Sequence, residues 1–325
     1  MHSHAAIRPR VASRLAIEIA LPVPLRSHLL GQWTRMSVVT ATVPPDWSPA
    51  DNPHAIAISE AQWWQRAAQL AVLRLHDSDD QRISWFSSRQ IDARQLVFAL
   101  RQILNAERLV VVAMEARGVG TGALETLAGA RQRFEDALPG IKDMRDALMH
   151  FDEWSRGKGR GPQKDRRDAG EALRDVAREY WGFGYDPNAG TVSLGPYTIQ
   201  VDTADQAAKD LSWAIYQAAR EVDQANAGEV LSRTVEVLNN AGISCASTSS
   251  EEVSLWVRVK DDSRAWLSLT AAGLNQPERR ELSEQIVSVL AQARLRLVSI
   301  NQAENLEPSE RLLRGEALYV ESDGV

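Results

Sequence analysis

The segment of residues 92 to 118 does most to restrict how this chain can fold. It reads DARQLVFALRQILNAERLVVVAMEARG, and Asp92 and Gly118 predict the start and the end of one long helix. Its apolar residues recur at the spacing of a single helical face, at Val97, Leu100, Leu104, Val111 and Met114. The glycines that follow, in RGVGTG, lack the G-x-G-x-x-G spacing of a dinucleotide-binding loop. The segment therefore predicts a helix, a turn and a second helix.

Other stretches with a helical period predict a mainly α-helical protein. They are residues 59–76 beginning at Ser59, residues 122–138, roughly 141–154 after the break at Pro139-Gly140, a segment ending at Tyr180, and residues 204–226 ending near Gly228. Pro187-Asn188-Ala189-Gly190 lies between two short β-like runs, so we expect a β-hairpin inserted among the helices.

Both flanks of the helical region alternate apolar and polar residues, which is typical of strands. Residues 14–45 do so and run into a proline-rich linker, and residues 251–261 and 264–271 do so ahead of a predicted helix. We therefore expect three parts. Residues 1–54 are a β-rich segment and linker, 55–227 a helical domain, and 228–325 a small α+β domain.

Composition limits the kinds of protein and site that remain. The chain is 44% hydrophobic and 25% charged, and its net charge of −6 requires any polyanion to bind at a local patch. Cys245 is the single cysteine and the six histidines include no His-x-x-x-His pair, so we expect no metal and no cofactor. No apolar run reaches the roughly 20 residues of a membrane span. We expect a cytoplasmic protein that makes no membrane contact.

The segment GIKDMRDALMHFDEWSRGKGR, residues 140 to 160, carries the strongest chemical pattern. Arg145, Asp146 and His150 stand in it as Arg-Asp-x-x-x-His. At about 100° per residue, Asp146 and His150 share a helix face and can hydrogen-bond, whereas Arg145 points about 140° away from His150. An imidazole that moves protons and a guanidinium that binds phosphate are the groups that RNA transesterification without a metal requires.

On residue types alone, this pattern also fits a surface arginine and a histidine near a helix C-terminus, where the helix dipole favours a cation. The segment that follows Trp154 is equally open to two interpretations. It carries six cations and one anion, Asp165, so it either binds phosphates or is a solvated, glycine-rich linker. The six cations are Arg156, Lys158, Arg160, Lys164, Arg166 and Arg167.

Residues 55–227 resemble, roughly over their whole length, the HEPN (higher eukaryotes and prokaryotes nucleotide-binding) superfamily. The resemblance rests on the motif in a helix after a Pro-Gly break, on HFDEWSRGKGR directly after it, and on the hairpin and last amphipathic helix that follow. The resemblance implies a helical bundle and, as in many members, a metal-independent endoribonuclease that works as a homodimer. It implies a setting in a bacterial toxin or antiviral defence system, where a regulatory or antitoxin protein is a further partner. Some members have lost catalysis.

The expected activity is cleavage of RNA through attack of the 2′-hydroxyl on the adjacent phosphate. His150 would act as general acid or base, Arg145 would stabilise the charge on phosphorus, and Asp146 would orient His150. The six cations after Trp154 would bind RNA. Two alternatives remain, a non-catalytic bundle that dimerises or binds a nucleotide or partner protein, and an interaction protein whose function lies in residues 229–325.

Overall fold

The computed structural model describes residues 48–80, 82, 87–246, 255–270, 273–301 and 305–322. This part of the chain is mostly helical and contains two small antiparallel sheets, as the sequence predicts. The strands expected within residues 14–45 lie outside the described residues. None of the helices in the described ranges combines the length and the apolar character that crossing a membrane requires.

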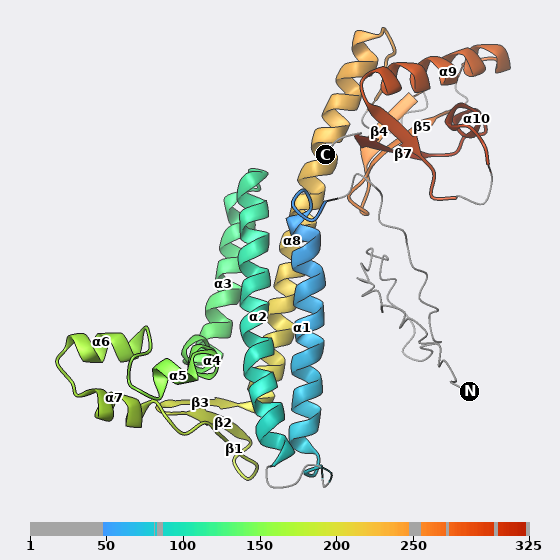
Figure 1. Cartoon of the computed structure of the whole chain (residues 1–325). Coiled ribbons are helices and arrows are strands. Elements are labelled where there is room, and N and C mark those ends of the chain that lie inside the picture. Colours follow the sequence, from blue (N-terminus) through green and yellow to red (C-terminus); the bar gives the residue numbers. More distant parts are fainter. Residues whose placement is uncertain are drawn as a thin grey trace, which may run out of the picture. The chain divides into compact units, whose positions relative to one another are not determined.

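Four long helices build the first core. They are α1 (Pro53–His76), α2 (Ser88–Ala116), α3 (Thr121–Ala137) and the first part of α8 (Val201–Asn240), which lie side by side in Figure 1. The face that α1 buries is made of small side chains, at Ala57, Ala61, Ala68 and Ala71. Because alanine adds little bulk and has the highest helix propensity, α1 can pack closely against α2 and α8.

The predicted starts of the first two helices were wrong. α1 begins at Pro53 rather than Ser59, and α2 begins at Ser88 rather than Asp92. Proline suits the first turn of a helix because the N–H that it lacks would have no partner there. The predicted end of α2 is confirmed, since Gly118 has a φ of 61° and the next N–H, of Val119, donates to the Met114 carbonyl at 3.0 Å.

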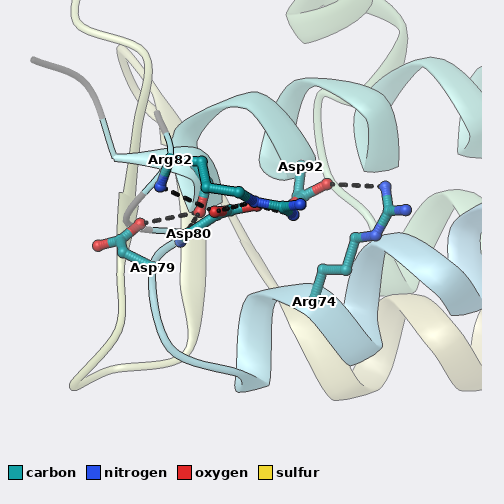
Figure 2. A network of polar contacts seen from close by, with 6 residues as sticks. Arg74, Asp79, Asp80, Arg82 and Asp92 are labelled. Atoms are coloured by element: carbon teal, nitrogen blue, oxygen red, sulfur yellow. Dashed lines mark hydrogen bonds and ion pairs between the residues drawn. The ribbon is translucent and has the colours of Figure 1, made fainter. Parts of the chain in front are cut away.

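Polar contacts hold the connection between α1 and α2 (Figure 2). Arg74 near the end of α1 lies 3.6 Å from the Asp92 carboxylate in α2. In the connection itself, the Arg82 guanidinium donates to both oxygens of Asp80, which lowers the pKa of Asp80 to about 2. Asp79 accepts a 2.6 Å hydrogen bond from the Ser87 hydroxyl directly before α2. These contacts fix the first two helices as an antiparallel pair.

The predicted hairpin is confirmed and belongs to a three-stranded antiparallel sheet. Its strands are β1 (Gly184–Asp186), β2 (Thr191–Leu194) and β3 (Tyr197–Gln200), in the order β1-β2-β3. The side-chain amide of Gln90 in α2 bonds the backbone of Tyr185 in both directions, at 3.0 and 3.1 Å. The Tyr185 hydroxyl donates to the carbonyl of Leu75 at 3.0 Å. The sheet is therefore tied to the helices at its first strand.

The second core lies in the C-terminal part of the chain. Its sheet has the order β4-β5-β7-β6, from β4 (Leu255–Val259), β5 (Ala265–Leu269), β6 (Leu295–Val298) and β7 (Leu318–Ser322). One face packs against α9 (Gln276–Gln292), α10 (Pro308–Leu313) and the end of α8. The predicted end of a helix near Gly228 was wrong, because α8 continues to Asn240 and contributes Leu238 to this core.

Candidate functional site

The helix predicted over residues 141–154 is interrupted at His150. α4 (Ile141–Met149) ends before it and α5 (Phe151–Trp154) begins after it, while His150 itself has a non-helical φ of −115° and ψ of 41°. α4 buries Ile141, Met144 and Ala147 in the first core, which leaves its other side toward solvent. The His150 side chain is exposed and makes no hydrogen bond or ion pair within the described residues.

The hydrogen bond expected between Asp146 and His150 is not formed. The Asp146 carboxylate instead accepts a 2.8 Å hydrogen bond from Nη1 of its neighbour Arg145. The two residues meet only through the backbone, where the His150 N–H donates to the Asp146 carbonyl at 2.9 Å. Because the helix ends at His150, the ring does not continue the face that carries Asp146. In this structure Asp146 therefore holds Arg145, and its orientation of His150 during a reaction stays a prediction.

Arg145 keeps donor capacity after this pairing. Its side chain is 25% exposed, and its Nε is buried without a hydrogen-bond partner. Arg101 on α2 lies within electrostatic reach of both Arg145 and Asp146. Burial lowers the pKa of Arg101, Asp146 opposes that shift, and Arg145 adds to it. The sequence reasoning missed Arg101, since only the packing of α4 on α2 brings the two arginines together.

A contact from β3 fixes the position of α4. The Tyr197 hydroxyl donates a 2.8 Å hydrogen bond to the Asp143 carboxylate, two residues before Arg145. Burial raises the pKa of Asp143, and the hydrogen bond from Tyr197 opposes that rise. Gly140, at the start of α4, has a φ of 76°, and a Cβ there would lie 2.1 Å from the Tyr197 ring. The glycine therefore allows both the turn and the close approach of the ring.

Apolar side chains lie in the open on both sides of His150. Met149 is 50% exposed and Phe151 is 63% exposed. These two residues are the chain neighbours of His150, so the exposed imidazole stands beside apolar surface.

The basic segment after Trp154 is an ordered structure, and its interpretation as a solvated linker was wrong. It contains α6 (Pro162–Asp168) and leads into α7 (Leu173–Glu179). Gln163 is fully buried and joins the Gly159 N–H, at 2.8 Å, to the Trp154 carbonyl, at 3.1 Å. Arg167 donates to the carbonyls of Gly157 and Gly159, each at 2.8 Å. The glycines are thus packing positions.

Most of the six cations predicted to bind RNA are already engaged. Arg166 is paired with Glu171 and Glu179, and Lys164 lies 2.6 Å from Asp168. Arg156 bonds the Asp152 carbonyl at 2.7 Å. The side chains of Lys158 and Arg160 are exposed and have no hydrogen bond or ion pair in the described ranges. Over residues 152–179 eight cations stand against seven carboxylates, so the folded region has little excess positive charge.

The described residues contain no cluster of three or more histidine, cysteine, aspartate or glutamate side chains that could hold a metal ion. Comparisons with protein-family models, curated proteins and solved structures give no match to this chain. Function is therefore inferred from the residues around His150 and their geometry.

Proposed function

We propose that the chain is a metal-independent endoribonuclease of the HEPN type that works as a homodimer in a bacterial toxin or antiviral defence role, in the cytoplasm. The observation that carries the proposal is the combination at the end of α4. His150 is exposed and follows Arg145 by five positions. A carboxylate holds the Arg145 guanidinium in place, and the side chain is still 25% exposed.

In the proposed reaction, the 2′-hydroxyl attacks the adjacent phosphorus and the bond from phosphorus to the 5′-oxygen breaks. One His150 takes the proton from the 2′-hydroxyl, the His150 of the second copy gives a proton to the departing 5′-oxygen, and Arg145 stabilises the charge on the phosphoryl oxygens. The products are a 2′,3′-cyclic phosphate and a 5′-hydroxyl. Arg101 adds positive potential behind Arg145, while Asp146 keeps the guanidinium oriented.

A second copy of the chain completes the proposed site. On an ideal helix Arg145 and His150 would point about 140° apart, but α4 ends before His150, so the case for a second copy rests on the family resemblance and on the surface beside His150. Two copies related by a two-fold axis place equivalent residues opposite each other. The exposed Met149 and Phe151 beside His150 supply apolar surface that such an interface would bury.

The test compares cleavage of single-stranded RNA by the wild type and by His150→Ala in excess EDTA. We expect the wild type to leave cyclic phosphate ends and His150→Ala to be slower by about 10²- to 10⁴-fold, the usual contribution of a general acid or base. Equal rates in both proteins, or activity that requires an added divalent ion, would contradict the proposal. His76→Ala, which removes an exposed histidine outside the motif, is the control.

One observation favours the alternative of a non-catalytic bundle that dimerises or binds a nucleotide or partner protein. Within the described residues, no side chain orients the His150 imidazole, whereas general bases in enzymes are commonly held by a second group. In that case both proteins would be inactive on RNA, and self-association would still depend on Met149 and Phe151.

A further inference from the structure

The second sheet has two chemically different faces. Leu255 and Val257 of β4 belong to the second core, so the residues between and beyond them point to the opposite, outer face. The register places Arg258 of β4 beside Trp266 of β5, and Trp266 beside Tyr319 of β7. Trp266 is 5% exposed, yet it lies outside that apolar core. The outer face is therefore a row of aromatic and basic residues over adjacent strands.

Cations stack on each of these aromatic rings. The Arg258 guanidinium lies 4.5 Å from the ring centre of Trp256, and the Arg264 guanidinium lies 4.6 Å from that of Tyr319. The Lys260 ammonium lies 3.9 Å from the ring of Trp266. Trp266 and Tyr319 meet edge to face, with ring centres 5.7 Å apart. The aromatic rings on this face thus hold three cations at the surface through cation–π contacts.

A carboxylate lies within electrostatic reach of Lys260, but none forms an ion pair with these three cations in the described residues. Arg258, Lys260 and Arg264 make no ion pair in the part of the chain that the structure describes. The nearest candidate, Asp262, accepts the Trp266 indole N–H at 3.0 and 3.1 Å. Burial lowers the pKa of Lys260, the charge of Arg258 adds to that shift, and the charge of Asp262 opposes it. Over residues 255–264 these three cations stand against Asp261 and Asp262, so the excess of positive charge is small, but the cations are not held in ion pairs as Lys164 and Arg166 are.

We propose that the outer face of the second sheet binds single-stranded RNA. Arg258, Lys260 and Arg264 contact phosphates, and unpaired bases stack on the half-buried rings of Trp256 and Tyr319 or on the guanidinium planes above them. Trp266 is too buried to stack and supports the others. The choice of RNA over DNA rests on the proposed nuclease function, for which this face would capture the substrate.

A single strand fits these features better than a duplex or an acidic protein. Bases in a duplex are already stacked on each other and cannot reach aromatic rings on a sheet. An acidic peptide satisfies the cations and leaves the rings without a partner. A single strand supplies phosphates and open base faces at once, as sheet-based RNA-binding modules require.

The experiment measures anisotropy of a fluorescein-labelled oligouridylate of about 12 nucleotides with full-length protein. The His150→Ala background suppresses cleavage by the protein itself, and EDTA suppresses any contaminating metal-dependent nuclease. Arg258→Gln/Lys260→Gln is compared with Arg280→Gln/Arg294→Gln, a control that removes two exposed positive charges elsewhere in the same part of the chain. We expect the first pair to lower the slope of log affinity against log salt by about 1.4, from two lost phosphate contacts, and the control to leave it unchanged.

Stacking is tested separately with Trp256→Ala and Trp256→Phe. We expect roughly tenfold weaker binding for alanine and near-normal binding for phenylalanine, which keeps an aromatic face. Equal binding by the Arg258/Lys260 and control variants, or competition by polyglutamate as strong as that by unlabelled RNA, would overturn the proposal. Duplex RNA is expected to bind less tightly. Equal affinity for oligothymidylate would overturn the assignment to RNA.

The failure of this inference and that of the nuclease proposal give different results. Wild type that never cleaves RNA, together with weakened binding by Arg258→Gln/Lys260→Gln, removes the nuclease and keeps the binding face. Wild type that cleaves RNA, together with sheet variants that bind normally, removes the binding face and keeps the nuclease.

Discussion

The hydroxyl of Tyr197 on β3 donates a 2.8 Å hydrogen bond to the Asp143 carboxylate on α4. This contact joins a strand of the first sheet to the helix that carries Arg145, 52 positions earlier than Tyr197 in the chain. Any strain or loosening at the sheet is thereby passed to the base of α4. The half-buried carboxylate also makes the contact sensitive to pH.

The first prediction concerns Asp143→Asn. Burial raises the folded-state pKa of Asp143 above its ordinary value of 3.8, so its contribution to stability is fully present below that value and is lost as pH rises through the folded pKa. Asparagine carries no charge and can still accept from Tyr197. We expect Asp143→Asn to melt at a higher temperature than wild type near pH 7, with the difference shrinking toward about pH 4. A difference in melting temperature that grows as the pH falls would contradict a raised pKa for Asp143. Exposed Asp210→Asn is the control.

The second prediction concerns Gly140→Ala. A Cβ at this position meets the Tyr197 ring at 2.1 Å and requires a φ of 76°, so the substitution combines a clash with backbone strain. Gly170→Ala requires a φ of 89° and meets nothing within 4 Å. We expect a loss of about 3 kcal/mol or more for Gly140→Ala and about 1 kcal/mol for Gly170→Ala in urea unfolding. Similar losses in both variants would show that Tyr197 is free to move aside.

The third prediction separates two roles for Asp146. Because its carboxylate contacts Arg145 and not the His150 ring, Asp146→Asn should weaken cleavage of RNA by about tenfold without moving the pH profile of the reaction. His150→Ala should abolish the profile. A shifted pH optimum in Asp146→Asn would mean that the carboxylate orients His150 when RNA is bound. The comparison uses rates at saturating RNA across the pH range.

The fourth prediction divides the basic residues after Trp154 into two groups. Lys158→Gln/Arg160→Gln removes charges that have no partner in the described ranges, and we expect weaker RNA binding with an unchanged melting temperature. Lys164→Gln/Arg166→Gln removes cations that already pair with Asp168, Glu171 and Glu179, so binding should change less. Anisotropy titrations and melting curves check both pairs. The opposite ranking would show that RNA displaces those ion pairs.

The long helices could be predicted from the periodic spacing of apolar residues. The residues at which each helix begins or breaks could not. The apolar face of α2 continues through LVVVAM, and the structure has one unbroken helix there. Ser59 and Asp92 resemble capping residues, yet both lie inside helices, because tertiary packing extends each helix toward an earlier start. The break at His150 follows neither a glycine nor a proline, so no local signal marks it.

The sequence predicted which residues belong to the candidate site, but it did not predict the contacts between them. The spacing of Asp146 and His150 on an ideal helix indicated a hydrogen bond that the end of α4 prevents. The glycine-rich composition after Trp154 indicated mobility because a sequence does not show that Gln163 is buried among the glycines. The aromatic and basic face of the second sheet could have been predicted from the sequence, because alternation along β4 places Trp256 and Arg258 on the same side.

The helix α8 contributes Val222 to the first core and Leu238 to the second, with Gly228 between them. A glycine inside a helix costs roughly 1 kcal/mol relative to alanine, and a Cβ at Gly228 would meet nothing within 4 Å. The helix is therefore easiest to interrupt at this point, and an interruption here would uncouple the two cores. Alanine at the same position would raise the energy needed to interrupt the helix. The residue at position 228 belongs to neither core, yet it sets how strongly the unfolding of one core is coupled to that of the other.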